Sequence, residues 1–190
     1  MARMIPKHWH ENTPRSEQRI FELLKNDPLT DNWVVLHSLN LKQTGTRPYG
    51  EIDFVVLIPG GTIICIEVKG GRVACREGIW TSTDSADRTS VLKRSPFVQA
   101  QDGMHELRRS LEERFGATRE FYQIAFGFAV VFTDIEAPPP DIATQPWEII
   151  DLVGLRGGIA KLLVNAAKQQ RARLNLRGQQ PEPQAQTVRK

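Results

Sequence analysis

The chain lacks the features that mark membrane-spanning and secreted proteins. Its 190 residues include two cysteines, too few for a disulfide framework, so both thiols are expected to be free and structural. The longest apolar run, around Ile124 to Phe132, is far too short to cross a bilayer. The N-terminus contains no apolar segment of the kind found in secretory signals. We therefore expect a cytoplasmic protein with no membrane partner.

Several motifs of common enzyme classes are also missing. No spacing of cysteine and histidine indicates a zinc site, and the histidines that flank Trp9 lie in a terminal segment expected to be solvated. The pairs Gly60-Gly61 and Gly70-Gly71 are typical of hairpin turns rather than of phosphate-binding loops. No serine, histidine and acid form a readable catalytic triad. Zinc, nucleotide-binding and triad chemistry are therefore not indicated.

Composition and length are those of one ordinary globular domain. Hydrophobic residues make up 40% of the chain and charged residues 25%, and the length is sufficient to bury a core. The net charge of +3 is unevenly distributed, since the segment from Lys161 to Lys190 contains seven basic residues and one acid, Glu182. A basic segment is compatible with nucleic-acid contact and also with keeping a helix and tail soluble. Charge alone favours neither.

Two apolar runs separated by a turn sequence predict a short β-hairpin. The runs are 54–58 and 62–66, and Pro59-Gly60-Gly61 lies between them. If the hairpin is centred on Gly60, Asp53 lies directly opposite Glu67. Opposed residues have Cβ atoms roughly 5 Å apart, close enough for both carboxylates to hold one divalent cation.

Lys69 adds a positive charge to this end of the hairpin. Side chains on a strand alternate, so Lys69 emerges on the same face as Glu67. Two carboxylates and an amine would then converge, which is a candidate metal-dependent hydrolytic site. The alternative is an ion pair that decorates the hairpin mouth. The geometry also depends on an odd-numbered loop, because a two-residue loop would place Asp53 and Glu67 on opposite faces.

The remaining pattern predicts the order α-β-β-β-β-α-β-α. Both faces of the hairpin strands are apolar, so helices are expected on both sides of an α/β sheet. Segments 42–50, 81–94 and 138–140 are expected to be loops. The expected elements are a helix from an N-cap at Thr13 to about Asp27, strands at 33–39, 52–58, 62–69 and 72–76, a helix from an N-cap at Ser95 to about Gly116, a strand at 122–132 and a helix at about 155–175.

Two helix starts bring further candidates. Glu17 lies one turn into the first helix and on its inward face. A first-turn acid is also favoured by the helix dipole, which explains its position along the helix but not its direction. Gln99 and Gln101 flank the apolar stripe in the first turn of the second helix, where backbone amides favour an anion.

These residue types suit phosphodiester hydrolysis. The reaction requires a nucleophilic water, neutralisation of the phosphoryl charge and help for the departing oxygen, all of which carboxylate-bound Mg²⁺ can supply. A lysine beside the metal can lower the pKa of the water or donate to the scissile phosphate. Asp53, Glu67 and Lys69 meet this requirement, although other Mg²⁺ hydrolases also pair carboxylates.

The ordered set resembles the NERD (nuclease-related) domain, a branch of the PD-(D/E)xK nuclease superfamily. The resemblance covers roughly Pro14 to Gly154. It implies a restriction-endonuclease-like three-layer α/β core, in which a central mixed sheet with an antiparallel hairpin is flanked by helices on both faces. It also implies a Mg²⁺-dependent deoxyribonuclease, a hydrolase for which Mn²⁺ would substitute, with a role in DNA processing or repair. The matching residues are Glu17, Gly50-Glu51-Ile52-Asp53, Glu67-Val68-Lys69 and Ser95-Pro96-Phe97-Val98-Gln99.

Carried over by position, the resemblance assigns roles to individual residues. It makes Asp53, Glu67 and Glu17 the metal ligands and Lys69 the catalytic lysine. Gln99 matches the glutamine of the Pro-x-x-Gln segment, whereas Gln101 has no match. The chain departs from the superfamily's name at Ile52, which stands where a proline would precede Asp53. This branch commonly lacks that proline.

The expected organisation is an extension at 1–13, a NERD-like nuclease domain at 14–177 and a disordered Gln/Pro-rich tail at 178–190. Such domains are often fused to helicases or kinases, so the basic helix and tail are expected to link to, or dock onto, a helicase or other repair protein. DNA is the expected substrate, and the sequence does not indicate an oligomeric state. One alternative is a catalytically weak or inactive module that binds DNA or a partner in a repair or restriction system. Another is an unrelated α/β protein whose hairpin charges are structural.

Overall fold

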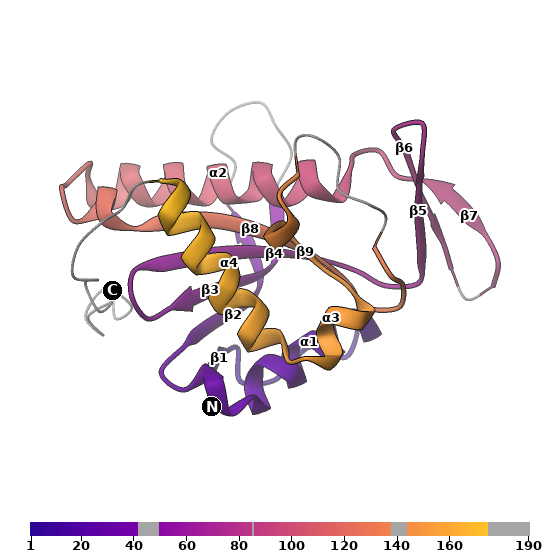
Figure 1. Cartoon of the computed structure of the whole chain (residues 1–190), viewed down its shortest axis with the longest axis horizontal. Helices are drawn as coiled ribbons and strands as arrows, with labels where there is room; N and C mark the ends of the chain where they lie inside the picture. The colour runs from indigo at the N-terminus through magenta and orange to yellow at the C-terminus, as the bar shows by residue number, and fades with distance from the viewer. Residues whose placement is uncertain (42–49, 85, 138–143, 175–190) are drawn as a thin grey trace.

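The computed structural model describes residues 1–41, 50–84, 86–137 and 144–174 (Figure 1). Its strands are β1 (Arg3–Ile5), β2 (Val34–Leu41), β3 (Gly50–Ile58), β4 (Thr62–Lys69), β5 (Arg72–Arg76), β6 (Ile79–Thr83), β7 (Thr89–Val91), β8 (Ala125–Phe132) and β9 (Ile149–Ile150). Its helices are α1 (Arg15–Asn26), α2 (Pro96–Phe115), α3 (Leu152–Arg156) and α4 (Ile159–Arg173), with short 3₁₀ helices η1 (Pro28–Thr30), η2 (Phe121–Gln123) and η3 (Pro146–Glu148). The six strands of the main sheet are ordered β1-β2-β3-β4-β8-β9, and β5-β6-β7 form a separate three-stranded sheet.

The β3–β4 hairpin is the centre of the main sheet. Phe54 pairs with Ile66 and Val55 with Cys65, which is the register expected for a turn centred on Gly60. Gly60 has φ 99°, a left-handed conformation that glycine adopts without strain. Strand β8 lies parallel to β4 on the far side of the hairpin. The predicted mixed sheet with a central antiparallel hairpin is therefore confirmed.

Helices cover both faces of this sheet, as the two-sided apolar pattern predicts. Alternate hairpin residues face opposite ways, so that Phe54 belongs to one buried cluster and Val55 to another. The cluster of Phe54 is completed by α1 and α4, and the cluster of Val55 by α2 (Figure 1). The result is the predicted three-layer α/β fold.

The two helix starts are built differently. Ser95 caps α2 as predicted, because its side chain accepts a hydrogen bond from the Phe97 N–H at 3.2 Å. Thr13 does not cap α1, since Pro14 occupies the N-cap position and makes no side-chain bond. Instead the Gln18 side chain donates to the Thr13 carbonyl at 2.7 Å, which ties the preceding segment to the first turn.

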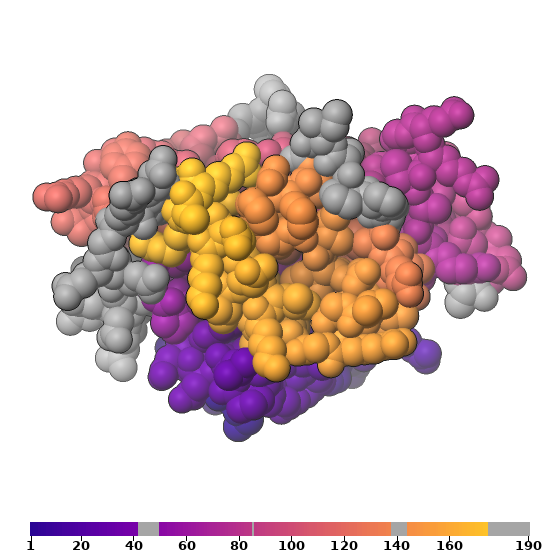
Figure 2. Space-filling model, in the orientation of Figure 1, coloured from indigo at the N-terminus to yellow at the C-terminus, as the bar shows by residue number. Residues whose placement is uncertain are grey.

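Part of the segment predicted as a loop at 81–94 is β-sheet. Strand β6 pairs with β5 and with β7, so that Thr81 lies opposite both Ala74 and Val91. This sheet stands at one end of the molecule (Figure 2), where its residues are mostly exposed. Exposed strands do not need apolar alternation, and a Thr-rich sequence suits them. The hydrophobic pattern therefore could not indicate these strands.

The ends of the chain also differ from expectation. Strand β1 pairs in parallel with β2 and adds an edge strand to the main sheet. The last helix is divided into α3 and α4 at Gly157 and Gly158, and Gly158 has φ 99°. The strand predicted from Tyr122 begins at Ala125, after a 3₁₀ turn. The predictions for 42–49, for the prolines at 138–140 and for the tail lie outside the described residues.

Part of the C-terminal basic charge is structural. The guanidinium of Arg171 is buried and donates to the carbonyl oxygens of Gly61 and Gln123 at 3.1 and 3.3 Å. Arg173 pairs with the buried Glu148 at 3.6 Å. These contacts anchor α4 beside the turn of the hairpin. Among the described helices, none is long and apolar enough to span a bilayer.

Candidate functional site

The open end of the β3–β4 hairpin collects three ionisable side chains. The Val68 N–H donates to Asp53 Oδ2 at 2.7 Å, which holds Asp53 against the facing strand. The Lys69 ammonium donates to Glu67 Oε1, also at 2.7 Å. The register of the ladder, continued by one pair beyond Phe54, places Asp53 opposite Glu67. The hairpin thus brings Asp53, Glu67 and Lys69 together.

Both carboxyl groups are costly to ionise where they lie. The pKa of Asp53 is raised to about 8, first by desolvation and then by the neighbouring Glu67 carboxylate, against the opposing Val68 hydrogen bond. The pKa of Glu67 is also raised, chiefly by desolvation, although Lys69 acts in the opposite direction. Glu17 contributes to the upward shift of both pKa values. The site therefore contains more carboxyl groups than the Lys69 ammonium could neutralise if all of them were ionised.

Glu17 reaches this site from the first turn of α1. Its side chain is 13% exposed, and Oε2 lies 3.0 Å from Nε2 of His37 on β2. Helix α1 packs on the sheet face of Phe54, whereas Asp53 and Glu67 share the alternation of Val55. Glu17 therefore approaches the end of the hairpin from the α1 side of the sheet, whereas Asp53 and Glu67 lie on the α2 side.

A glycine after the hairpin allows α1 to sit this close. A Cβ on Gly70 would lie 2.8 Å from the Cβ of Ser16, the residue before Glu17. The next residue, Gly71, donates its N–H to Asp134 Oδ2 at 2.7 Å. Arg19 of α1 donates to the Thr133 carbonyl at 2.7 Å. These contacts fasten the start of α1 to the ends of β4 and β8, and they set the position of Glu17.

His37 is part of the site, and the sequence interpretation missed it. Its side chain is fully buried, stacks on Phe54 at a centroid distance of 4.7 Å and meets the edge of Phe21 at 5.5 Å. Nδ1 has no hydrogen-bond partner among the described residues. We assign the tautomer that donates from Nε2 to Glu17, because it leaves only a lone pair unpaired at Nδ1 rather than a buried N–H. The available signal was a histidine at an inward position of a largely apolar strand.

A hollow of about 710 Å³ opens onto part of this site. Glu17, His37 and Asp53 lie in its wall, and Glu67, Lys69 and Gln99 do not. The opposite wall comes from the segment before α1. The residues that line it are Ile5, Pro6, His10, Asn12, Thr13, Pro14, Glu17, His37, Ser38, Asn40, Glu51 and Asp53.

The structure does not connect the two glutamines to the carboxylates. Gln99 is half-buried in the first turn of α2, and its side chain makes no hydrogen bond to any residue within the described ranges. Gln101 is exposed. Their proposed roles therefore have no supporting contact, in contrast to Glu17, Asp53, Glu67 and Lys69.

The chemistry of the three carboxylates fits a hard divalent cation, whose preferred ligands are oxygens. A protein donor engages one oxygen of each group: Val68 for Asp53, Lys69 for Glu67 and His37 for Glu17. Within the described part of the chain, no three histidine, cysteine or acidic side chains are arranged as a metal site. Metal binding would therefore require side-chain rearrangement and loss of the proton that the raised pKa of Asp53 retains, and the attraction between a divalent cation and the carboxylates would favour both.

Comparison with known proteins identifies the family. A family model described as the nuclease-related domain, NERD, matches residues 14–133, which is more than half of the chain. The matched region runs from the residue before α1 to the residue after β8 and contains the hairpin and the start of α2. No curated protein and no solved structure matches the chain. The chain therefore belongs to the nuclease-related domain family.

Proposed function

We propose that this domain hydrolyses DNA phosphodiester bonds with Mg²⁺ or, in its place, Mn²⁺, in DNA processing or repair. The observation that carries the proposal is the pair of the half-buried Asp53 and the buried Glu67, both with raised pKa values, beside a single ammonium. Buried like charges are destabilising unless something compensates them. A divalent cation would provide that compensation, and membership of a nuclease-related family agrees with it.

Each residue has a distinct role in this proposal. Asp53, Glu67 and Glu17 would hold the metal ion, which when bound supplies an activated water and neutralises phosphoryl charge. An ammonium has three N–H donors, so Lys69 can keep its bond to Glu67 and also donate to a water or a phosphate oxygen. His37 orients the Glu17 carboxylate from within the core.

Cleavage assays on the full chain test the proposal. Single- and double-stranded DNA would be incubated with Mg²⁺ or Mn²⁺ and with the wild type, Asp53→Ala or Lys69→Ala. We expect each substitution to reduce the cleavage rate by at least about 100-fold. Arg88→Ala, which removes an exposed ion pair of the smaller sheet, is the matched control and should cut normally. Cleavage that survives both site substitutions would contradict the assignment.

A second candidate is an inactive module that binds DNA or docks onto a helicase or other repair protein. It is favoured by one observation: every site carboxylate already has a protein donor, and the described residues form no metal-binding cluster. This candidate predicts DNA affinity without any Mg²⁺- or Mn²⁺-dependent cutting. It also predicts that Mn²⁺ leaves the melting temperature of the wild type unchanged.

A further inference from the structure

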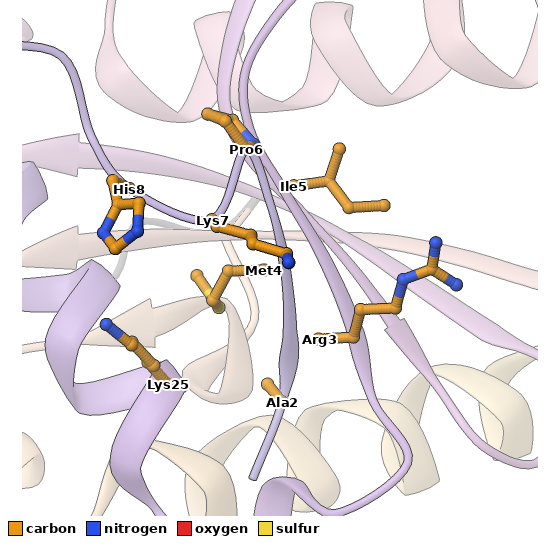
Figure 3. A pocket seen from close by; sticks show the side chains of 8 residues that line it. All are labelled: Ala2, Arg3, Met4, Ile5, Pro6, Lys7, His8 and Lys25. Carbon is orange, nitrogen blue, oxygen red and sulfur yellow. The ribbon is translucent and has the colours of Figure 1, made fainter.

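A second hollow lies beside the site and is strongly basic. It has a volume of about 500 Å³, within the range that small-molecule sites occupy. It is formed by the N-terminal segment, including β1, and by one residue of α1 (Figure 3). The residues that line it are Ala2, Arg3, Met4, Ile5, Pro6, Lys7, His8 and Lys25. Three of these are permanently cationic, one is a histidine and none is acidic.

The cations of this basic hollow are largely uncompensated. Within the described ranges, no ion pair or side-chain hydrogen bond engages Arg3, Lys7 or His8. Lys25 has one distant carboxylate partner, Glu22, at 3.8 Å, and its side chain remains 37% exposed. In the view of Figure 3, Lys25 and His8 lie to one side of β1, Arg3 lies to the other, and Lys7 lies between them. Unpaired cations around a concave surface favour an anionic ligand.

The basic hollow adjoins the hollow of the catalytic carboxylates. Ile5 and Pro6 line both of them, so the two form neighbouring compartments separated by these residues. One compartment is acidic and contains Glu17 and Asp53, and the other is basic. A strand of DNA carries a phosphate at every nucleotide, about one per 3.4 Å of helix axis. A strand whose scissile phosphate lies at the carboxylates and which continues across Pro6 would place other phosphates at the basic hollow.

We propose that Lys7, His8 and Lys25 form a phosphate subsite for the DNA strand that enters the carboxylate site. The subsite neutralises a backbone phosphate that flanks the bond to be cut, and so it fixes the position of the strand along the site. Most of it belongs to residues that precede the family match at 14–133, so the match itself does not cover it. This inference rests on the proposed function for its ligand.

A binding assay tests the subsite without relying on cleavage. The affinity of the full chain for short labelled single-stranded and duplex oligonucleotides would be measured by fluorescence anisotropy in EDTA, over a series of KCl concentrations. We expect Lys7→Ala with Lys25→Ala to raise Kd about tenfold and to reduce the salt slope by about 1 to 2, because each lost phosphate contact lowers it by about 0.7–0.9. The matched control is Lys161→Ala with Lys168→Ala, which removes two exposed lysines of α4 and should change Kd less than about twofold.

The possible outcomes separate this inference from the proposed function. If the Lys7/Lys25 variant binds DNA like the control variant, or if the wild type does not bind DNA, the phosphate subsite is wrong. If the wild type cuts DNA while the Lys7/Lys25 variant keeps full affinity, hydrolysis stands and the subsite falls. If the wild type binds through these lysines but never cuts, the subsite stands and the proposed hydrolysis falls. Melting temperatures of both variants, expected to match the wild type, confirm that each is folded.

Discussion

The β3–β4 and β5–β6 hairpins follow one another along the chain, and they carry charge in opposite ways. In the first, the Asp53 carboxyl is half-buried beside Glu67, and its pKa is raised to about 8. Directly after the second, in the β6–β7 connection, Asp84 is solvated, and hydrogen bonds from Arg88 lower its pKa. Both hairpins are antiparallel and turn through glycine.

The comparison shows that solvent exposure, rather than the presence of charged residues, distinguishes a candidate functional site from a strand with ordinary surface charges. The smaller sheet pairs Arg72 with Asp87 and Arg88 with Asp84 at the surface, where water solvates whatever the protein does not. At the main hairpin two helices exclude water, so the same side-chain types become costly. Ionisable groups with strongly shifted pKa values are concentrated at functional sites. The following experiments test this contrast.

Thiol labelling should give the largest difference between the hairpins. Burial raises the pKa of Cys65 in β4 to about 12, whereas Cys75 in β5 is only partly buried. Since the thiolate is the reactive form, we expect iodoacetamide to modify Cys75 at least about 100-fold faster, and Cys65 only after global unfolding. Mass spectrometry of the native protein measures both rates, and Cys75→Ser serves as the control. Equal labelling rates for the two thiols would show that the helices do not exclude solvent from Cys65 in the main hairpin.

Alanine at the two hairpin glycines should separate packing from backbone strain. In Gly70→Ala the new Cβ meets Ser16, so α1 must shift, and we expect a loss of about 2–3 kcal/mol in the free energy of unfolding. Gly78 has φ 79° with open space around it, so Gly78→Ala should cost only about 1–2 kcal/mol from backbone strain. Urea denaturation measures both. Adding Ser16→Gly to Gly70→Ala should restore part of the loss, and no recovery would exclude the clash as its cause.

Removing one cation from each hairpin compares a buried ion pair with an exposed one. Lys69→Ala leaves Glu67 buried without its partner, so we expect a loss of about 2 kcal/mol at pH 8 in the absence of metal. Arg72→Ala breaks a solvated pair and should change the free energy of unfolding by less than about 0.5 kcal/mol. Thermal unfolding in EDTA measures the difference. Equal effects would support the interpretation of the hairpin charges as merely structural.

The last comparison concerns pH. Because the pKa of Asp53 is about 8 in the folded protein against 3.8 as its ordinary value, the native state binds the additional proton between these limits. The free energy of unfolding of the metal-free protein should therefore fall as pH rises from about 4 to about 8. Glu67 and Glu17 raise the pKa of Asp53 and so strengthen this dependence, whereas Lys69 lowers that pKa and weakens it. Asp53→Asn should flatten this dependence and be more stable than the wild type above pH 8. Urea denaturation in EDTA at several pH values between about 4 and about 8 measures this dependence. If the free energy of unfolding of the wild type rises with pH over this range, the predicted direction is wrong.

Sequence patterns predicted the main sheet well and the smaller one poorly. Buried strands such as β4 and β8 are nearly all apolar, so they stand out against any background. Strand β6 is mostly half-buried and β7 is exposed, and the residues of both follow no hydrophobic period. Thr13 suits an N-cap by residue type, yet the first helical hydrogen bond runs from the Gln18 N–H to the Pro14 carbonyl, which makes Pro14 the N-cap.

The sequence by itself determined that Asp53 faces Glu67 and that Lys69 shares their side of the sheet. Side-chain alternation and an odd-numbered turn are local geometry, so the residues from Asp53 to Lys69 are sufficient to specify it. Only the tertiary structure decided that His37 holds Glu17, and that residues before α1 wall the carboxylates and form a basic hollow beside them. These contacts join segments whose proximity depends on how an edge strand and a helix pack against the finished sheet. The hydrophobic periodicity of the sequence does not indicate that packing.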